Sequence, residues 1–285
     1  EAGVNHNGDL ATSLSLVDAA SSCGADIVKF QTFTADQLVT QDAAKAEYQK
    51  ATTSNTETQF EMLRKLELSH SDHLAIIERC QERGIGFLST GFDIGNIDML
   101  VGLGMDRIKV PSGEITNLPY LRHIGGLGLP TILSTGMADL EEVRNALDVL
   151  LACGSSSSDV TILHCTTDYP AAMGDVNLQA MVTMRDAFGV EVGYSDHTLG
   201  YEVAVAAVSL GAVVIEKHLT LDRESAGPDH AASLEPEEFA NMVRAIRNIE
   251  IALGDGIKRP QSSECANMAV ARKSLVASER IQEGE

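Results

Sequence analysis

Short apolar runs alternate with helix-like stretches from the first residue to about residue 254. Runs of this length, rich in β-branched and aliphatic residues, predict buried strands. They lie at 26–33, 85–90, 107–112, 131–135, 160–166, 190–195 and 213–218, and the opening EAGVN predicts the end of an eighth strand. Several of the stretches between them end in glycine, the usual residue after a helix. Eight βα units over roughly 250 residues predict an α/β fold, a closed (β/α)8 TIM barrel.

Three other features complete the predicted organisation. An open, doubly wound sheet is the alternative fold, but no GxGxxG follows the first strand. The polar, acidic stretch from 34 to about 60 interrupts the second unit, and we expect it to form a helical arm over the site. We therefore expect a barrel over 1–255, a linker over 256–270 that is rich in Gly, Pro and Ser, and the first strand of an incomplete second domain over 271–285.

Charge and cysteine usage exclude several classes of protein. The formal net charge is −20 and no run of Lys or Arg exceeds two residues, which argues against nucleic-acid binding. An anionic ligand would need a local positive pocket within this acidic chain. No apolar run approaches the ~20 residues of a membrane span, and no signal peptide is visible. Five cysteines without a CxxC pair argue against a disulfide framework or a thiolate zinc site, so we expect a cytoplasmic protein.

Polar and charged side chains stand at almost every predicted strand end. In a barrel, this is where the active site forms. The residues are Lys29 and Gln31, Ser89 and Thr90, Lys109 with Ser112 and Glu114, Ser134 and Thr135, Ser195 with His197, and Glu216 with His218. Two lysines together with several hydroxyls predict a phosphate or carboxylate pocket. The alternatives are lysines that extend outside the barrel and serines that serve only as turn residues.

His197 and His218 end neighbouring predicted strands. Two converging imidazoles can hold a divalent metal and leave positions open for water and substrate, although a lone histidine is more often a core or surface residue. Without an obvious third protein ligand, hydrated Mn²⁺ or Mg²⁺ is favoured over structural zinc. Strict alternation places Glu216 and His218 on one face, so Lys217 is expected to point away from the site in a structural role.

A series of motifs runs through the chain in order. They are GVNHNGD (3–9), VKFQTF (28–33), IKVPSGEITNLP (108–119), LSTGMA (133–138), LHCTTDYP (163–170), GYSDHTLG (193–200), IEKHLTLDR (215–223), GPDHAASLEPEEF (227–239) and ARKSLVA (271–277). Together they resemble the sialic acid synthase family over essentially the whole chain. The resemblance implies a barrel followed by a small antifreeze-like (SAF) domain, and a homodimer when that domain is complete. It also implies that phosphoenolpyruvate condenses with an N-acylated hexosamine and releases phosphate.

The resemblance also assigns roles to individual positions. It implies that His197 and His218 hold the metal, Mn²⁺ with Mg²⁺ or Co²⁺ as alternatives, and that Glu114 and Lys109 take part in catalysis with them. The implied phosphoenolpyruvate contacts are Lys29, Thr90, Lys109, Ser112, Ser134 and Ser195. The implied sugar contacts are Gln31, Tyr169, Asp229 and Glu1.

Two positions depart from the family pattern. Gly91 stands where many relatives have proline, and Thr167 stands where neuraminate synthases often carry asparagine. Because position 167 faces the sugar in the family, the sugar is either N-acetylmannosamine or a 2,4-diacetamido-trideoxyhexose, which would give a legionaminate-type product. Two other readings compete. A synthase acting on an aldose phosphate would need further basic residues, which we do not find, and a non-catalytic carbohydrate-binding barrel would not need both lysines and both histidines.

Overall fold

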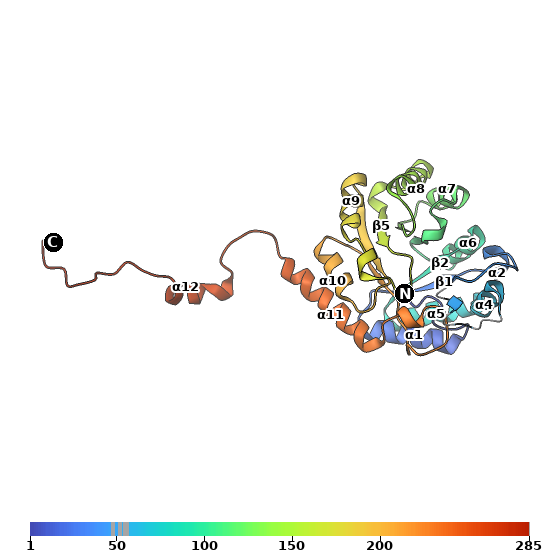
Figure 1. Ribbon diagram of the computed structural model, residues 1–285, viewed down its shortest axis with the longest axis horizontal. Helices are drawn as coiled ribbons and strands as arrows, with labels where there is room; N and C mark the ends of the chain where they lie inside the picture. The colour runs from blue at the N-terminus through green and yellow to red at the C-terminus, as the bar shows by residue number, and fades with distance from the viewer. Residues whose placement is uncertain (47–48, 51–52, 54–56, 285) are drawn as a thin grey trace. The chain divides into compact units, whose positions relative to one another are not determined.

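The computed structural model describes residues 1–46, 49–50, 53 and 57–284. The chain divides into two compact units, Glu1–Ala252 and Leu253–Glu285. All strands of the described residues lie in the first unit and pair in parallel, in a two-stranded and a five-stranded sheet (Figure 1). In sheet order they are β1 (Ile27–Thr32) and β2 (Gly86–Gly91), then β3 (Ile108–Val110), β4 (Thr131–Ser134), β5 (Val160–Cys165), β6 (Glu191–Asp196) and β7 (Ile215–Lys217). The predicted α/β fold is confirmed.

The predicted eighth strand at the start of the chain forms only a single parallel bridge, from Gly3 to Phe30. Its backbone nevertheless contacts both sheets. The Glu1 nitrogen donates to the Lys217 carbonyl at 2.8 Å, and the Ala2 nitrogen donates to the Lys29 carbonyl at 2.8 Å. Residues 1–3 therefore join the edge strand β7 of one sheet to the edge strand β1 of the other.

Helices separate the strands along the chain. The long ones are α1 (Leu10–Ser22), α5 (His70–Arg83), α6 (Ile94–Gly102), α7 (Leu118–Leu127), α8 (Leu140–Cys153), α9 (Gln179–Phe188), α10 (Glu202–Ser209) and α11 (Pro236–Leu253). The short ones are α2 (Ala35–Leu38), α4 (Gln59–Lys65), α12 (Cys265–Ala271) and the 3-10 turns η1 (Ser112–Glu114), η2 (Ser157–Asp159), η3 (Met173–Asp175), η4 (His230–Ala232) and η5 (Ser262–Glu264). Helix α5 illustrates why glycine marks the end of a helix. A capping box at Ser69 starts this helix, and Gly84 ends it in the left-handed conformation, with a φ of 65°.

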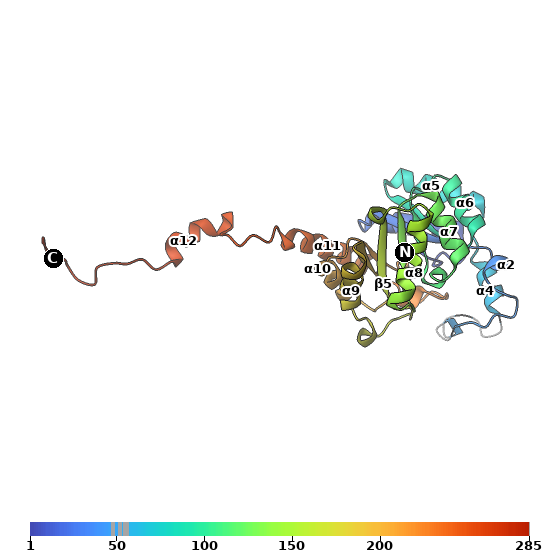
Figure 2. The same cartoon turned by 90° about the horizontal axis from the view of Figure 1, so that it is seen from above.

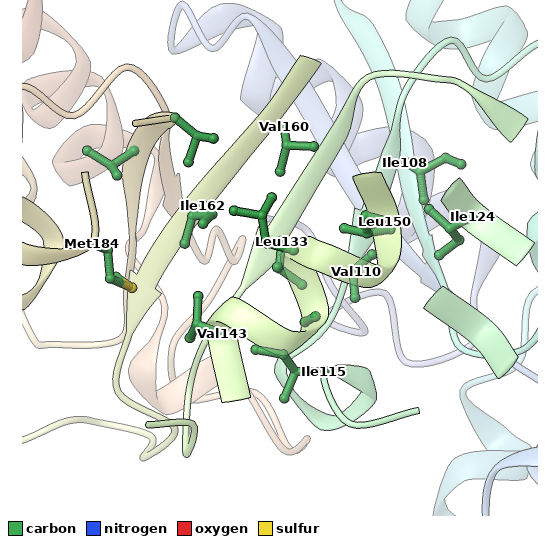
Figure 3. Close-up of a cluster of buried hydrophobic side chains, with 14 of the residues drawn as sticks. Ile108, Val110, Ile115, Ile124, Leu133, Val143, Leu150, Val160, Ile162 and Met184 are labelled. Carbon is green, nitrogen blue, oxygen red and sulfur yellow. The ribbon is translucent and has the colours of Figure 1, made fainter. Parts of the chain in front are cut away.

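The core explains how the strands present their polar residues. Ile108 and Val110 of β3 are fully buried and pack with Ile124 of α7 and Leu133 of β4 in one hydrophobic cluster (Figure 3). Successive side chains of a strand point to opposite faces. Lys109, between the two apolar residues, therefore points away from this cluster, and it lines a cavity at the ends of the strands.

The second unit differs from the sequence-based expectation. The turn η5 and all but the last residue of helix α12 lie within the stretch predicted as a linker, and residues 272–284 contain no strand. The strand predicted within 271–285 is wrong for these residues. They are exposed, and none of the described strands pairs with them to supply the hydrogen bonds that would stabilise an extended segment. Across the described residues, no helix combines the length and the apolar composition that crossing a membrane requires.

Candidate active site

A cavity of about 250 Å³ opens where the parallel strands end. It gathers every residue to which the family resemblance assigns a role except Glu114, whereas the strand-end residues Ser89 and Thr135 do not line it. The residues gathered are Glu1, Lys29, Gln31, Thr90, Lys109, Ser112, Ser134, Tyr169, Ser195, His197, His218 and Asp229. Most of these side chains are buried, although they are polar or charged. Because burying such groups is costly, their concentration in one cavity indicates that they serve a polar ligand.

Two lysines share one carboxylate at the base of the cavity. The Lys109 ammonium lies 2.9 Å from a Glu216 carboxylate oxygen, and the Lys29 ammonium lies 3.4 Å from the same oxygen. Lys29 also pairs with Glu1. Burial lowers the pKa of Lys29 to about 7. Burial opposes ionisation of Glu216, but Lys109 and Lys29 hold the pKa of its carboxyl well below the usual range. The two ammonium groups form a compact anion site.

Hydroxyl groups surround the two lysines. The Lys29 ammonium donates to Thr90 Oγ1 at 3.2 Å, and Ser195 Oγ donates to Glu216 at 2.7 Å. Ser112 Oγ accepts from the Gly136 nitrogen at 2.9 Å. Ser134 Oγ is buried and has no hydrogen-bond partner within the described residues. An unsatisfied buried hydroxyl is unfavourable, so a ligand oxygen is its natural partner.

The two predicted metal ligands lie side by side, with the His197 and His218 ring centroids 5.5 Å apart. His197 Nδ1 lies 2.7 Å from the Thr166 carbonyl oxygen. Because a carbonyl only accepts, Nδ1 carries the proton and Nε2 keeps its lone pair. His218 Nδ1 is buried without a hydrogen-bond partner in the described part of the chain, and Asp229 Oδ2 lies 3.9 Å from it. Burial lowers the pKa of both imidazoles, and His197 further lowers that of His218. Both therefore favour the neutral form that binds metals.

These residues fit a divalent cation with two protein ligands. Among the described residues, no cluster of three or more His, Cys, Asp or Glu side chains has the arrangement of a metal site. A cation at His197 and His218 would complete its coordination with water or substrate oxygens, which suits Mn²⁺ or Mg²⁺ better than structural zinc. The unpartnered nitrogen of His218 is the structural observation that supports this fit.

The residues expected to contact the sugar converge beside the histidines. The Tyr169 ring lies on the His197 ring at a centroid distance of 4.2 Å. Gly3 has a left-handed φ of 53°, and a β-carbon there would lie 3.2 Å from Glu1 Oε1 and 3.5 Å from both Asp229 Oδ2 and His218 Cε1. Glycine thus keeps open the space that Glu1, Asp229 and His218 share. Burial raises the pKa of Asp229 to about 6.

The chain matches the NeuB family over residues 16–258. It belongs to the NeuB family. It is 52% identical to N,N'-diacetyllegionaminic acid synthase of Campylobacter jejuni, over 100% of this chain and 85% of that protein. The identity to the synthase of the same name from Legionella pneumophila is also 52%, over 100% of this chain and 80% of that protein. The predicted resemblance to sialic acid synthases is confirmed.

A solved structure gives the same picture of the fold. The crystal structure of N-acetylneuraminic acid synthetase from Leptospira borgpetersenii serovar Hardjo-bovis, in complex with citrate, superposes with a TM-score of 0.82 at 33% sequence identity. The match covers 94% of this chain and 88% of that one. The arrangement of strands and helices in this NeuB-family chain is therefore that of a known synthase.

Among the residues to which the family resemblance assigns a role, Glu114 is the one that the structure does not bring to the cavity. It lies in the turn η1, and its carboxylate accepts from Asn117 Nδ2 at 2.6 Å. Ser112 and Gly113 of the same turn do line the cavity, but Glu114 does not. The Glu114 carboxylate instead contacts the residue that caps the start of α7.

Glu216 was predicted to face the site together with His218, and the structure shows that it pairs with both Lys29 and Lys109. The structure also adds an apolar wall that was not selected from the sequence, made of Val4, Phe33, Leu38, Met62, Leu63, Leu66 and Phe92. Leu38 of α2 lies in the predicted arm, from 34 to about 60, whereas Met62, Leu63 and Leu66 lie in or directly after α4, at its far end. Residues 47–48, 51–52 and 54–56 of that arm lie outside the described residues.

A buried ion pair lies next to the two histidines, outside the cavity. The Lys217 ammonium lies 2.9 Å from Asp196 Oδ2 and donates to the Thr198 carbonyl at 2.6 Å. Both charged side chains are fully buried. The prediction that Lys217 points away from the site is confirmed, since it does not line the cavity. The pair connects the ends of β6 and β7, directly beside His197 and His218.

Proposed function

We propose that this NeuB-family chain condenses phosphoenolpyruvate with an N-acylated hexosamine and water. The products are a nine-carbon, sialic-acid-type 2-keto acid and phosphate. The observation that carries the proposal is the pair Lys29 and Lys109, buried beside two neutral histidines in one cavity. The names of the relatives that share 52% identity support a product of this class.

Phosphoenolpyruvate carries a phosphate and a carboxylate, and the cavity base matches both. Lys29 and Lys109 supply two positive charges, and Ser134, Thr90, Ser195 and Ser112 supply hydroxyls around them. The Glu216 carboxylate forms ion pairs with both ammonium groups. The entering anion competes with Glu216 for these donors. The same ammonium groups then stabilise the negative charge on the phosphate as it leaves.

The reaction forms one carbon–carbon bond and breaks one bond to phosphate. The methylene carbon of phosphoenolpyruvate attacks the aldehyde carbon of the open-chain sugar, and the adjacent carbon takes up cationic character. Water adds to that carbon, and the resulting tetrahedral centre expels phosphate to leave the 2-keto acid. Lys29 and Lys109 hold the phosphate and carboxylate in place through both steps, which is the positioning that lowers the barrier.

The aldehyde end of the sugar belongs beside His197 and His218. We propose that these two histidines hold Mn²⁺, with Mg²⁺ or Co²⁺ as alternatives. When bound, the cation would supply Lewis-acid polarisation of the aldehyde oxygen. Gln31, Tyr169, Asp229 and Glu1 line the adjoining part of the cavity and are the proposed hydrogen-bonding and stacking partners of the sugar.

Glu114 is the proposed general base for the attacking water. Its carboxylate contacts Asn117 rather than the cavity, so this role requires the side chain to leave that hydrogen bond when substrates bind. The variant Glu114→Gln tests the role. It should bind phosphoenolpyruvate normally and lose turnover, whereas full turnover would assign the base to another group.

Four further proposals concern the architecture, the oligomeric state and the location of the protein. The two sheets, joined through residues 1–3, form one closed (β/α)8 barrel. Residues 271–285 are the start of an antifreeze-like (SAF) domain, and the protein with that domain complete is a homodimer in the cytoplasm. Support for closure comes from the Glu1 and Ala2 hydrogen bonds to the two edge strands.

Product analysis tests the proposed reaction. The chain is incubated with phosphoenolpyruvate, Mn²⁺ and either N-acetylmannosamine or a 2,4-diacetamido-trideoxyhexose, and phosphate and product mass are measured. We expect phosphate and a nine-carbon acid in equal amounts, lost in Lys109→Met and kept in the matched exposed control Lys258→Met. Phosphate release without a nine-carbon product, or no reaction with either sugar, contradicts the proposal.

A further inference from the structure

A long loop carries two of the residues that line the cavity. It runs over 218–235, from the end of β7 to the start of α11, and all of its residues are described. Apart from one isolated bridge, its only regular element is the turn η4. His218 opens the loop and Asp229 lies in its second half, and both side chains are buried in the cavity lining. A loop of this length needs contacts with the rest of the fold to hold these side chains in place.

The segment before α1 supplies such contacts through two asparagines, Asn5 and Asn7. In both views the chain starts in the middle of the first unit, so this segment can reach loops from distant parts of the sequence (Figures 1 and 2). Both asparagines belong to the GVNHNGD motif, and the proposed function gives them no role. Neither side chain lines the cavity. Any part that they play in the reaction is therefore indirect.

Asn5 binds both ends of the loop. Its buried amide nitrogen donates to the Leu219 carbonyl at 2.9 Å and to Ser233 Oγ at 2.9 Å. Ser233 Oγ in turn donates to the Asp229 carbonyl at 2.7 Å. Because this hydroxyl gives its proton to a carbonyl, it can only accept from Asn5, and the Leu219 carbonyl can only accept as well. One amide group thus holds the residue after His218 and, through Ser233, the backbone of Asp229.

Asn7 binds the middle of the loop. Its amide nitrogen donates to the Ala226 carbonyl at 2.9 Å and lies 3.3 Å from His230 Nε2. Asn7 has a left-handed φ of 51°, which asparagine adopts more readily than most residues with a side chain. A β-carbon at Gly227 would lie 2.8 Å from Asn7 Oδ1 and 2.6 Å from His230 Cδ2. Glycine is therefore needed where the asparagine meets the loop.

We propose that Asn5 and Asn7 are positioning residues, which hold the loop 218–235 so that His218 and Asp229 face the cavity. This inference rests on the proposed function, in which His218 holds the metal and Asp229 contacts the sugar. The lysines and hydroxyls of the anion site belong to β1, β2, β3, β4, β6 and η1, outside the loop. Loss of either asparagine therefore weakens binding of the metal and the sugar and spares phosphoenolpyruvate.

Asn5→Asp tests this role with a side chain of nearly the same shape that cannot donate. It turns a carboxylate oxygen toward the Leu219 carbonyl and breaks that contact. We expect the Kd for Mn²⁺, from titration followed by electron paramagnetic resonance, to rise about tenfold, and the KM for the sugar to rise with it. This factor is the lower end of the effect of residues that orient metal ligands. The Kd for phosphoenolpyruvate, from isothermal titration at saturating Mn²⁺, should change less than about twofold.

A second variant and a control separate positioning from a general loss of stability. Asn7→Gly removes an exposed side chain and suits the left-handed backbone, so it should fold and shift the same two constants in the same direction. Thr131→Val is the control. Thr131 is buried like Asn5 and donates to the Leu129 carbonyl at 3.0 Å, at the start of β4 and away from the cavity. It should leave all three constants unchanged, and thermal unfolding verifies that each variant is folded.

The outcomes separate this inference from the proposed function. Unchanged constants for Mn²⁺ and sugar in the folded asparagine variants overturn it. Equal weakening of phosphoenolpyruvate, or the same changes in Thr131→Val, also overturns it, since either result shows a general disturbance. If Asn5→Asp does not fold, Asn7→Gly decides. An unaltered chain that binds Mn²⁺ but condenses no sugar overturns the proposed function, whereas the comparison of Mn²⁺ binding still decides the role of the asparagines.

Discussion

The buried pair of Lys217 and Asp196 offers a sharp test of how the fold holds the site. The Lys217 ammonium has two partners, Asp196 Oδ2 at 2.9 Å and the Thr198 carbonyl at 2.6 Å. Asp196 Oδ1 accepts from the backbone nitrogen of Thr198 at 3.0 Å and from its hydroxyl at 2.7 Å. The Lys217 ammonium and both carboxylate oxygens of Asp196 therefore have hydrogen-bond partners. Burial lowers the pKa of Lys217, while the Asp196 carboxylate opposes that shift.

Lys217→Met removes the charge and keeps most of the side-chain volume. It leaves Asp196 as a fully buried carboxylate without a cation and the Thr198 carbonyl without its donor. Breaking a buried pair in this way costs about 3–5 kcal/mol of unfolding free energy. Replacing both partners by apolar residues removes the unpaired charge. The double variant Lys217→Met with Asp196→Leu should therefore recover part of the loss, and the remainder reflects the Thr198 carbonyl, nitrogen and hydroxyl that still lack their partners.

Urea denaturation followed by circular dichroism measures these changes. The control is Arg247→Met, because Arg247 pairs with Asp26 at 2.7 Å on the surface, where the two side chains are 44% and 80% exposed. A surface pair is worth about 1 kcal/mol or less. If Lys217→Met costs no more than Arg247→Met, the pair does not hold the ends of β6 and β7 as we argue.

Two further predictions concern the metal and the pH dependence of stability. EDTA should stop condensation and added Mn²⁺ should restore it; undiminished turnover in EDTA would contradict the metal assignment of His197 and His218. Burial, reinforced by His73, lowers the pKa of His6 to about 4, below its unfolded value of about 6.5. Between these values only the unfolded chain binds the proton, so the free energy of unfolding should fall by roughly 3 kcal/mol from pH 6.5 to 4. His6→Asn should flatten this part of a chemical-denaturation profile, and an unchanged slope would exclude His6 as its source.

The strands were predictable because their signal is local. A run such as 160–166 is apolar and β-branched along its length, and it forms β5 (Val160–Cys165). The same alternation predicted that Lys217 faces away from His218, which its ion pair with Asp196 confirms. The opening segment is the exception. It lies between two edge strands and makes two backbone hydrogen bonds on each side, with one isolated bridge rather than a ladder.

The missed features depend on contacts between distant parts of the chain. Glu216 reaches Lys109 across 107 positions, and no local pattern reports that pairing. Leu38 and Met62 belong to a polar stretch without strand periodicity, and they gain their place only when α2 and α4 pack on Phe33. In the second unit, the apolar pattern after 271 suggested a strand, but a strand requires a neighbour for its hydrogen bonds.

The central claim is that Lys29 and Lys109 form the anion site of a phosphoenolpyruvate-dependent synthase. Isothermal titration of phosphoenolpyruvate into this chain, with Mn²⁺ present, tests it most directly. We predict saturable one-to-one binding that disappears in Lys109→Met and persists in Lys258→Met. Absence of binding by the folded chain, or equal binding by Lys109→Met, would contradict the account.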